Sequence, residues 1–283
     1  MRQRPLIVAD ELAATLRSAR PPTVLDVRWT HGIGSNESEY LRGHVPGASF
    51  VDLDAELCGP ADDSGKRPIP QPDTFTTAMQ RHGVCSSRPV VVYDADDSSA
   101  AARAWWLLRY FGHSDVSVLD GGYSAWSRCS DAVKTGHLRF GKYGDFVAVP
   151  GGMPVCDAEG AAALARSGIL LDARRRELYL GGIKSGDRAG GHIPGALSAP
   201  TFEYSNPDGT FRSTDALIGL LKMYGVSRES DAPIGVYCGT GISATHTVLA
   251  LAKIGLTVAL YPGSWSHWLA DPTRPIARGS EPG

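Results

Sequence analysis

No apolar run in this chain approaches the roughly 20 residues that a membrane-spanning helix needs. The apolar stretch near the amino terminus is only a few residues long, which is too short for the central region of a secretory signal peptide. The formal net charge is −2, and no dense block of lysine and arginine is present. The composition therefore argues against a protein that binds nucleic acid or a membrane surface electrostatically.

Cysteine is scarce, and its pattern excludes two further classes of protein. The count of five is odd, the positions are scattered, and no two cysteines form a Cys-x-x-Cys pair. This argues against a disulfide framework and against a zinc site. We expect reduced thiols in a cytoplasmic protein, with one reactive cysteine and four inert ones. The five are Cys58, Cys85, Cys129, Cys156 and Cys238.

The first half of the chain recurs in the second half. At 283 residues with 42% hydrophobic content, the chain has enough apolar material for two cores. Five landmarks recur in the same order, offset by 142 to 148 positions. A repeat this long indicates a duplicated domain, because solenoid units are far shorter. The matched segments are 24–28 with 170–174, 43–48 with 191–196, 83–84 with 225–226, 92–94 with 236–238, and 121–126 with 263–268.

Each copy alternates short β-branched runs with helical patterns, which predicts an α/β fold. Strands that are apolar on both faces and separated by helices indicate a parallel sheet covered by helices on both faces. We predict a first domain over 1–138, a Gly- and Pro-rich linker over 139–152, and a second domain over 153–283. Strands are predicted at 24–28, 90–94, 116–120, 169–173, 234–238 and 257–261. Helices are predicted near 10–18, 73–82, 98–111, 157–166, 214–224 and 242–254.

The segment from Val236 to Ala244 changes its pattern at a cysteine. A β-type run ends on Cys238, and a loop with two glycines leads directly into a helical pattern. This arrangement directs backbone N–H groups and the positive end of a helix at the sulfur, and both favour the nucleophilic thiolate. The corresponding strand of the first copy ends on Asp94. We therefore expect a nucleophile in the second copy and a vestigial position in the first.

The landmarks together resemble the rhodanese sulfurtransferases in their tandem form, from about residue 8 to 268. That resemblance implies two similar α/β domains, an inactive first one, and a catalytic cysteine that opens a six-residue loop in the second. The loop Cys238-Gly239-Thr240-Gly241-Ile242-Ser243 is similar to the loop of the 3-mercaptopyruvate sulfurtransferases. Thiosulfate-preferring relatives usually carry basic residues after the cysteine, and this chain does not.

The resemblance also implies a mechanism. Cys238 attacks the sulfur of 3-mercaptopyruvate, expels pyruvate as its enolate and keeps the sulfur as a persulfide. A thiol, cyanide or a thioredoxin-like protein then removes that sulfur. Loop N–H groups are expected to hold the persulfide, with the hydroxyls of Thr240 and Ser243 as further donors. The reaction needs no cofactor or metal.

The chain departs from the family where the substrate carboxylate is held. An arginine is common just before the aromatic-x-Gly step, and Leu178 stands there instead. Arg188 and Lys184 are the candidate replacements, and Trp265 is a further candidate for lining the pocket. In the first domain, Arg67 takes the place of a family histidine near a Pro-rich turn. These changes leave the thiol chemistry intact and put the donor in question.

Three alternatives accompany this interpretation. Thiosulfate is the nearest rival donor. Phosphatases of related fold use Cys-x₅-Arg, which would place an arginine at position 244, where this chain has Ala244. A persulfide carrier without rapid turnover is the third.

Other residues that stand out are given structural roles. His44 and His192 occupy matching turns and are expected to form hydrogen bonds there. Trp126 and Trp268 recur at one repeat position and are expected to pack in the cores.

Overall fold

The computed structural model describes residues 4–130, 132–138, 143–183, 187–229 and 231–283. The chain forms two compact units. The first unit comprises Met1–Gly59, Ile69–Met153 and Asn206–Phe211, and the second comprises Pro60–Pro68, Pro154–Ser205 and Arg212–Gly283. Within the described residues, no helix has the length and apolar character required to cross a membrane.

The first unit is built on a parallel sheet with strand order β1-β7-β6-β2-β5. Its central strands are buried along their whole length, as expected of a sheet covered on both faces. A short antiparallel pair, β3 (Trp29–Thr30) with β4 (Gly34–Ser35), follows β2. The sheet strands are β1 (Leu6–Ile7), β2 (Thr23–Asp26), β5 (Ala48–Phe50), β6 (Val90–Tyr93) and β7 (Val116–Leu119).

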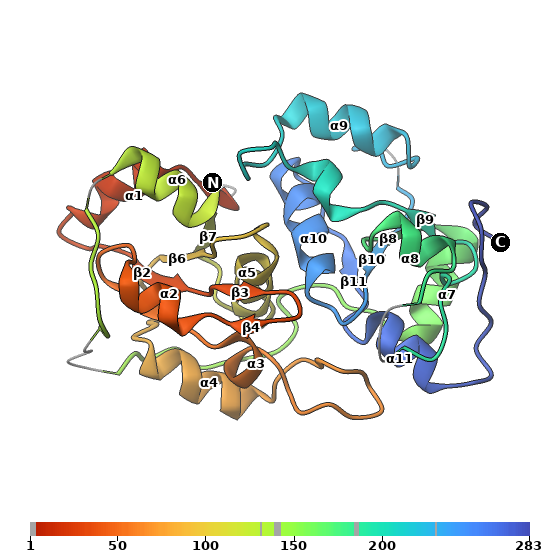
Figure 1. Cartoon of the computed structure of the whole chain (residues 1–283), viewed down its shortest axis with the longest axis horizontal. Helices are drawn as coiled ribbons and strands as arrows, with labels where there is room; N and C mark the ends of the chain where they lie inside the picture. Colours follow the sequence, from red (N-terminus) through yellow and green to blue (C-terminus); the bar gives the residue numbers. More distant parts are fainter. Residues whose placement is uncertain (1–3, 131, 139–142, 184–186, 230) are drawn as a thin grey trace. The chain divides into compact units, whose positions relative to one another are not determined.

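Helices cover both faces of that sheet. On one face, α1 and α6 lie side by side, and Leu12 and Trp126 pack with Val24 and Val91 (Figure 1). On the other face, α5 packs against β6 and β7. Alternate residues of each strand therefore enter different cores. The helices are α1 (Ala9–Leu16), α2 (Glu37–Arg42), α3 (Leu53–Glu56), α4 (Pro72–Arg81), α5 (Ser99–Tyr110) and α6 (Gly122–Cys129).

The second unit repeats this plan with strand order β11-β10-β8-β9, again parallel. Helices α7 and α11 contribute to a core with Leu170, Tyr237 and Trp268, while α10 packs against β10 and β11 (Figure 1). The strands are β8 (Ile169–Asp172), β9 (Leu197–Ser198), β10 (Ile234–Tyr237) and β11 (Ala259–Leu260). The helices are α7 (Ala158–Ser167), α8 (Arg176–Leu180), the 3₁₀ helix η1 (Thr201–Tyr204), α9 (Thr214–Lys222), α10 (Ser243–Lys253) and α11 (Ser264–Ala270).

The fold predicted from the repeat, two α/β domains with parallel sheets, is confirmed. The predicted linker, 139–152, lies partly outside the described residues, and the domain boundaries stay predictions. Two short segments join the unit formed mainly by the other half of the chain, 60–68 in the second unit and Asn206–Phe211 in the first. Both segments make long-range contacts that a local sequence pattern does not indicate.

Candidate active site

Cys238 lies at the carboxyl end of β10, a central strand, directly before the loop that leads into α10. Ligands of open parallel sheets bind at this edge. The cysteine is 2% exposed, and its sulfur accepts a hydrogen bond from the N–H of Gly241 at 3.2 Å. The main chain of Cys238 is fixed on both sides, because its N–H donates to Ser264 Oγ at 3.1 Å and its carbonyl accepts from Trp265 N at 2.9 Å. The sulfur is therefore held in one place beside a backbone donor.

The two glycines of the loop have different structural roles. Gly241 has a φ of +80°, and a Cβ built there would lie 2.3 Å from the carbonyl oxygen of Pro262. A side chain at this position therefore displaces either the loop or the segment after β11. A Cβ built at Gly239 meets nothing within 4 Å. Only Gly241 is required by the observed loop geometry.

This contrast predicts different effects for two matched substitutions. We expect Gly241→Ala to slow sulfur loading of Cys238 by roughly 100-fold, because it displaces the N–H that bonds to the sulfur. Gly239→Ala should keep the loading rate within a few-fold of the parent. Intact-mass measurement of persulfide formation over time gives both rates. Equal losses in the two variants would contradict the proposed role of Gly241.

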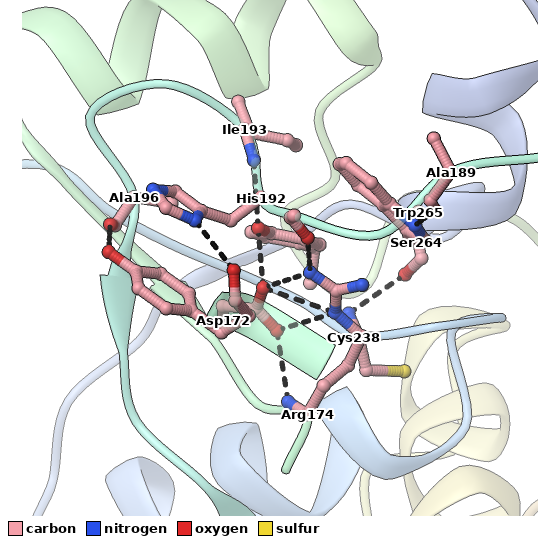
Figure 2. Close-up of polar contacts among 12 residues, drawn as sticks. Asp172, Arg174, Ala189, His192, Ile193, Ala196, Cys238, Ser264 and Trp265 are labelled. Carbon is pink, nitrogen blue, oxygen red and sulfur yellow. Dashed lines mark hydrogen bonds and ion pairs between the residues drawn. The ribbon is translucent and has the colours of Figure 1, made fainter. Parts of the chain in front are cut away.

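A buried network of hydrogen bonds and one ion pair stabilises the carboxyl end of β10. The carboxylate of Asp172 pairs with Arg174 at 2.5 Å and accepts the hydroxyl of Tyr237 at 2.6 Å. Tyr237 directly precedes Cys238. Arg174 also donates to the carbonyl of Gly191 at 2.6 Å, and its guanidinium lies 4.5 Å from the ring centre of Trp265. Figure 2 shows the Cys238 sulfur pointing away from these contacts.

The electrostatics of this network depend on pairing. Burial opposes the charge of Arg174, but the Asp172 carboxylate outweighs that effect and raises the pKa of the guanidinium. Burial and the same carboxylate raise the pKa of the Tyr237 hydroxyl well above its usual value. Arg174 therefore stays charged and Tyr237 neutral, so both serve as hydrogen-bond donors to the carboxylate.

The same network occurs in the first unit. Asp26 pairs with Arg28 at 2.8 Å and accepts the hydroxyl of Tyr93 at 2.6 Å. The turns that contain His44 and His192 also correspond. Each histidine stacks on a tyrosine and bonds through Nδ1 to that tyrosine's carbonyl oxygen at 2.9 Å. These contacts agree with the structural role predicted for both histidines.

Asp94 corresponds to Cys238 in the first unit, and its carboxylate binds the N–H groups that follow it. Both carboxylate oxygens of Asp94 take part, accepting N–H bonds from Asp96 at 3.2 Å, Ser98 at 3.1 Å and Ala101 at 3.0 Å. Burial, followed by the charge of Asp97, raises the pKa of Asp94 to about 7. The backbone donors that would face a sulfur in this loop thus bind a carboxyl group of the same chain.

Two of the three predicted substrate residues, Arg188 and Trp265, lie within the described residues. Arg188 donates to the carbonyl of Asp271 at 3.5 Å, at the end of α11. Trp265 is 1% exposed and donates to Ala189 O at 3.3 Å, so its observed contacts are those of a packing residue. Lys184 lies outside the described residues. Contact of these three with a donor stays a prediction, as do the roles of Thr240, Ile242 and Ser243.

Sequence reasoning missed Ser264. Its φ is +52°, an uncommon backbone conformation for a residue with a side chain. In that conformation its hydroxyl accepts from Cys238 N and donates to Tyr261 O at 2.9 Å. The corresponding residue, Gly122, has a φ of +55°, and a Cβ there would lie 2.5 Å from the Asp94 carbonyl. The replacement of this repeated glycine by serine was the available signal.

Comparison with known proteins identifies the family. The rhodanese-like domain model matches residues 8–129 and 157–271. The chain belongs to the rhodanese family. Both domains of the predicted tandem arrangement are thereby confirmed, and the second match contains the Cys238 loop.

Two curated relatives and one solved structure match most of this chain. SseB of Mycobacterium tuberculosis, named as a candidate thiosulfate sulfurtransferase, is 38% identical over 97% of each chain. The 3-mercaptopyruvate sulfurtransferase of Escherichia coli is 36% identical over 84% of each chain. The crystal structure of SseA from Escherichia coli, described as a 3-mercaptopyruvate sulfotransferase with the rhodanese fold, superimposes with a TM-score of 0.80. It is 34% identical, and the match covers 93% of this chain and all of that one.

Proposed function

We propose that this protein is a sulfurtransferase that carries sulfur as a persulfide on Cys238. The observation that carries the proposal is the sulfur of Cys238 at a strand end, bonded to the N–H of Gly241 and followed directly by α10. Backbone donors around a sulfur stabilise its anionic form, both as the attacking thiolate and as the terminal sulfur of a persulfide. The names of the full-length relatives support the same reaction class.

The donor we propose is 3-mercaptopyruvate. The Cys238 thiolate attacks the donor sulfur, the carbon–sulfur bond breaks, and its electron pair leaves with pyruvate as the enolate, which then takes a proton. An acceptor thiolate next attacks the outer sulfur, leaves with it and restores Cys238. Cyanide substitutes for the thiol in an assay, and a thioredoxin-like protein is the acceptor class we favour. The chemistry uses only the cysteine and the loop that holds it.

Thiosulfate is the second candidate donor, and one observation favours it. SseB, at 38% identity, is named for thiosulfate. The residues after Cys238 support mercaptopyruvate instead, because Gly239 and Thr240 add no positive charge for a sulfonate group.

The five cysteines all lie within the described residues, and none of them forms a disulfide. We propose a reducing compartment such as the cytoplasm.

A donor comparison tests the proposal. The purified protein is incubated with each donor, and pyruvate or sulfite release is followed together with the intact mass. We expect pyruvate release and one added sulfur with 3-mercaptopyruvate, and a kcat/KM at least tenfold higher than with thiosulfate, since each factor of ten requires only about 1.4 kcal/mol of differential binding. Higher efficiency with thiosulfate would assign the second donor. One added sulfur without repeated turnover would indicate a carrier.

A further inference from the structure

A turn from the first half of the sequence forms part of the second unit, beside the cysteine loop. Residues 60–68 belong to this unit by their contacts. The turn closes on itself through hydrogen bonds in both directions between Asp62 and Gly65, at 3.2 and 3.0 Å. It fits closely against the start of α11, because a Cβ built on Gly65 would lie 3.0 Å from Gly263 O and 3.1 Å from Ser266 Oγ. We call residues 60–68 the crossover turn.

Ser266 connects the crossover turn to the cysteine loop. Its hydroxyl accepts the N–H of Lys66 at 3.1 Å, and its own N–H donates to the carbonyl of Gly239 at 2.9 Å. Gly239 follows Cys238 directly. Ser266 thus positions both Lys66 and the cysteine loop, although Lys66 and Ser266 lie 200 positions apart in the sequence.

The ammonium group of Lys66 binds a carboxylate of the same chain. Its Nζ lies 2.8 Å from Oδ1 of Asp187, and the two side chains are 48% and 14% exposed. Asp187 is two residues before Ala189, whose carbonyl accepts the indole N–H of Trp265. Trp265 N in turn bonds to Cys238 O. Both members of the pair are therefore tied to the segment that carries the cysteine loop.

We propose that Lys66 binds the anionic group of the sulfur donor and that Asp187 competes with the donor for it. The proposal rests on the proposed sulfur transfer and adds a specificity-determining pair to it. Leu178 carries no charge, and Lys66 supplies a cation from another part of the sequence. A lysine ammonium is a compact charge that binds one carboxylate oxygen well, as it does with Asp187. Because the pair is partly exposed, an incoming carboxylate can exchange with Asp187.

If Lys66 and Asp187 control anion binding, substitutions at the two residues should have opposite effects, which a purely structural ion pair does not predict. We expect Asp187→Asn to improve the reaction of Cys238 with anionic reagents by roughly threefold to tenfold, because the negative charge of Asp187 no longer competes for Lys66. Lys66→Met should weaken that reaction by a similar factor. The double variant should behave like Lys66→Met, since without the lysine Asp187 has no competitive effect.

Alkylation of Cys238 measures its reaction with anionic reagents without requiring sulfur transfer. Iodoacetate carries a carboxylate and iodoacetamide is its neutral counterpart, so the ratio of their rates at Cys238 reports the local positive charge. Changes in the reactivity of the thiol affect both reagents and cancel in the ratio. Mass spectrometry of the peptide that contains Cys238 gives the two rates. Lys66→Arg is the conservative control and should keep the ratio of the parent.

Each outcome of this experiment decides the proposal. A ratio that rises in Asp187→Asn and falls in Lys66→Met supports it. A ratio unchanged in both variants, or lowered in both, overturns it, as does a parent Cys238 that neither reagent reaches. Failure of both sulfur donors to load Cys238 while the ratio changes as expected would reject the proposed function and keep the anion site.

Discussion

Cys238→Ser is expected to reduce sulfur transfer by on the order of 1,000-fold or more, the largest effect predicted for this protein. Serine is similar in shape and its oxygen can accept the N–H of Gly241, but it cannot form a persulfide. The variant should also show no added sulfur in its intact mass after incubation with 3-mercaptopyruvate. Pyruvate release and intact mass, measured on the same samples, check both statements.

Cys129→Ser is the matched control for this substitution. Cys129 is an exposed cysteine of the first unit, and its thiol donates to the carboxylate of Asp10 at 2.8 Å. That carboxylate raises the pKa of the Cys129 thiol and disfavours its nucleophilic form. We expect activity close to that of the parent. A Cys238→Ser protein that still gains one sulfur would show that another cysteine carries it.

Asp172→Asn is expected to lower the free energy of unfolding of the second unit by about 3–5 kcal/mol, the range for breaking one partner of a buried ion pair. The substitution leaves Arg174, which is 7% exposed, charged without its carboxylate partner. It also weakens the contact that orients Tyr237, the residue before Cys238. Urea unfolding, with hydrogen exchange to assign the loss to one unit, measures the effect.

Asp26→Asn is the matched control in the first unit. Its carboxylate makes the corresponding contacts with Arg28 and Tyr93, so we expect a comparable loss of stability, located in the first unit. At temperatures below the unfolding transition, this variant should load sulfur on Cys238 at a rate within a few-fold of the parent. An Asp172→Asn protein as stable as the parent would show that the buried pair is dispensable.

The two units differ in the residue that follows the matching central strand. Asp94 and Cys238 each directly follow a central strand and precede a helix. In the first unit the loop donors bind the Asp94 carboxylate. In the second unit, the N–H of Gly241 donates to the sulfur of Cys238. The residue after the strand thus determines whether the loop N–H groups bind a carboxylate or lie beside a cysteine sulfur.

By itself, the sequence determined the architecture of this protein and indicated Cys238 as its candidate nucleophile. The recurrence of Asp-x-Arg, Gly-His-x-Pro-Gly-Ala and the loop positions predicted two parallel sheets, because short apolar strands and amphipathic helices are local patterns with fixed periods. The position of Cys238 between a strand and a helix was predictable for the same reason, since strand, glycine loop and helix follow one another directly along the chain.

Only the tertiary structure revealed how the site is supported. Ser264 approaches Cys238 from another element, and the crossover turn brings Lys66 to Ser266 across 200 positions of sequence. Asp187 meets Lys66 through the same long-range packing. Such contacts depend on where distant segments meet in the fold, and a hydrogen bond or an ion pair between them has no sequence period to predict it.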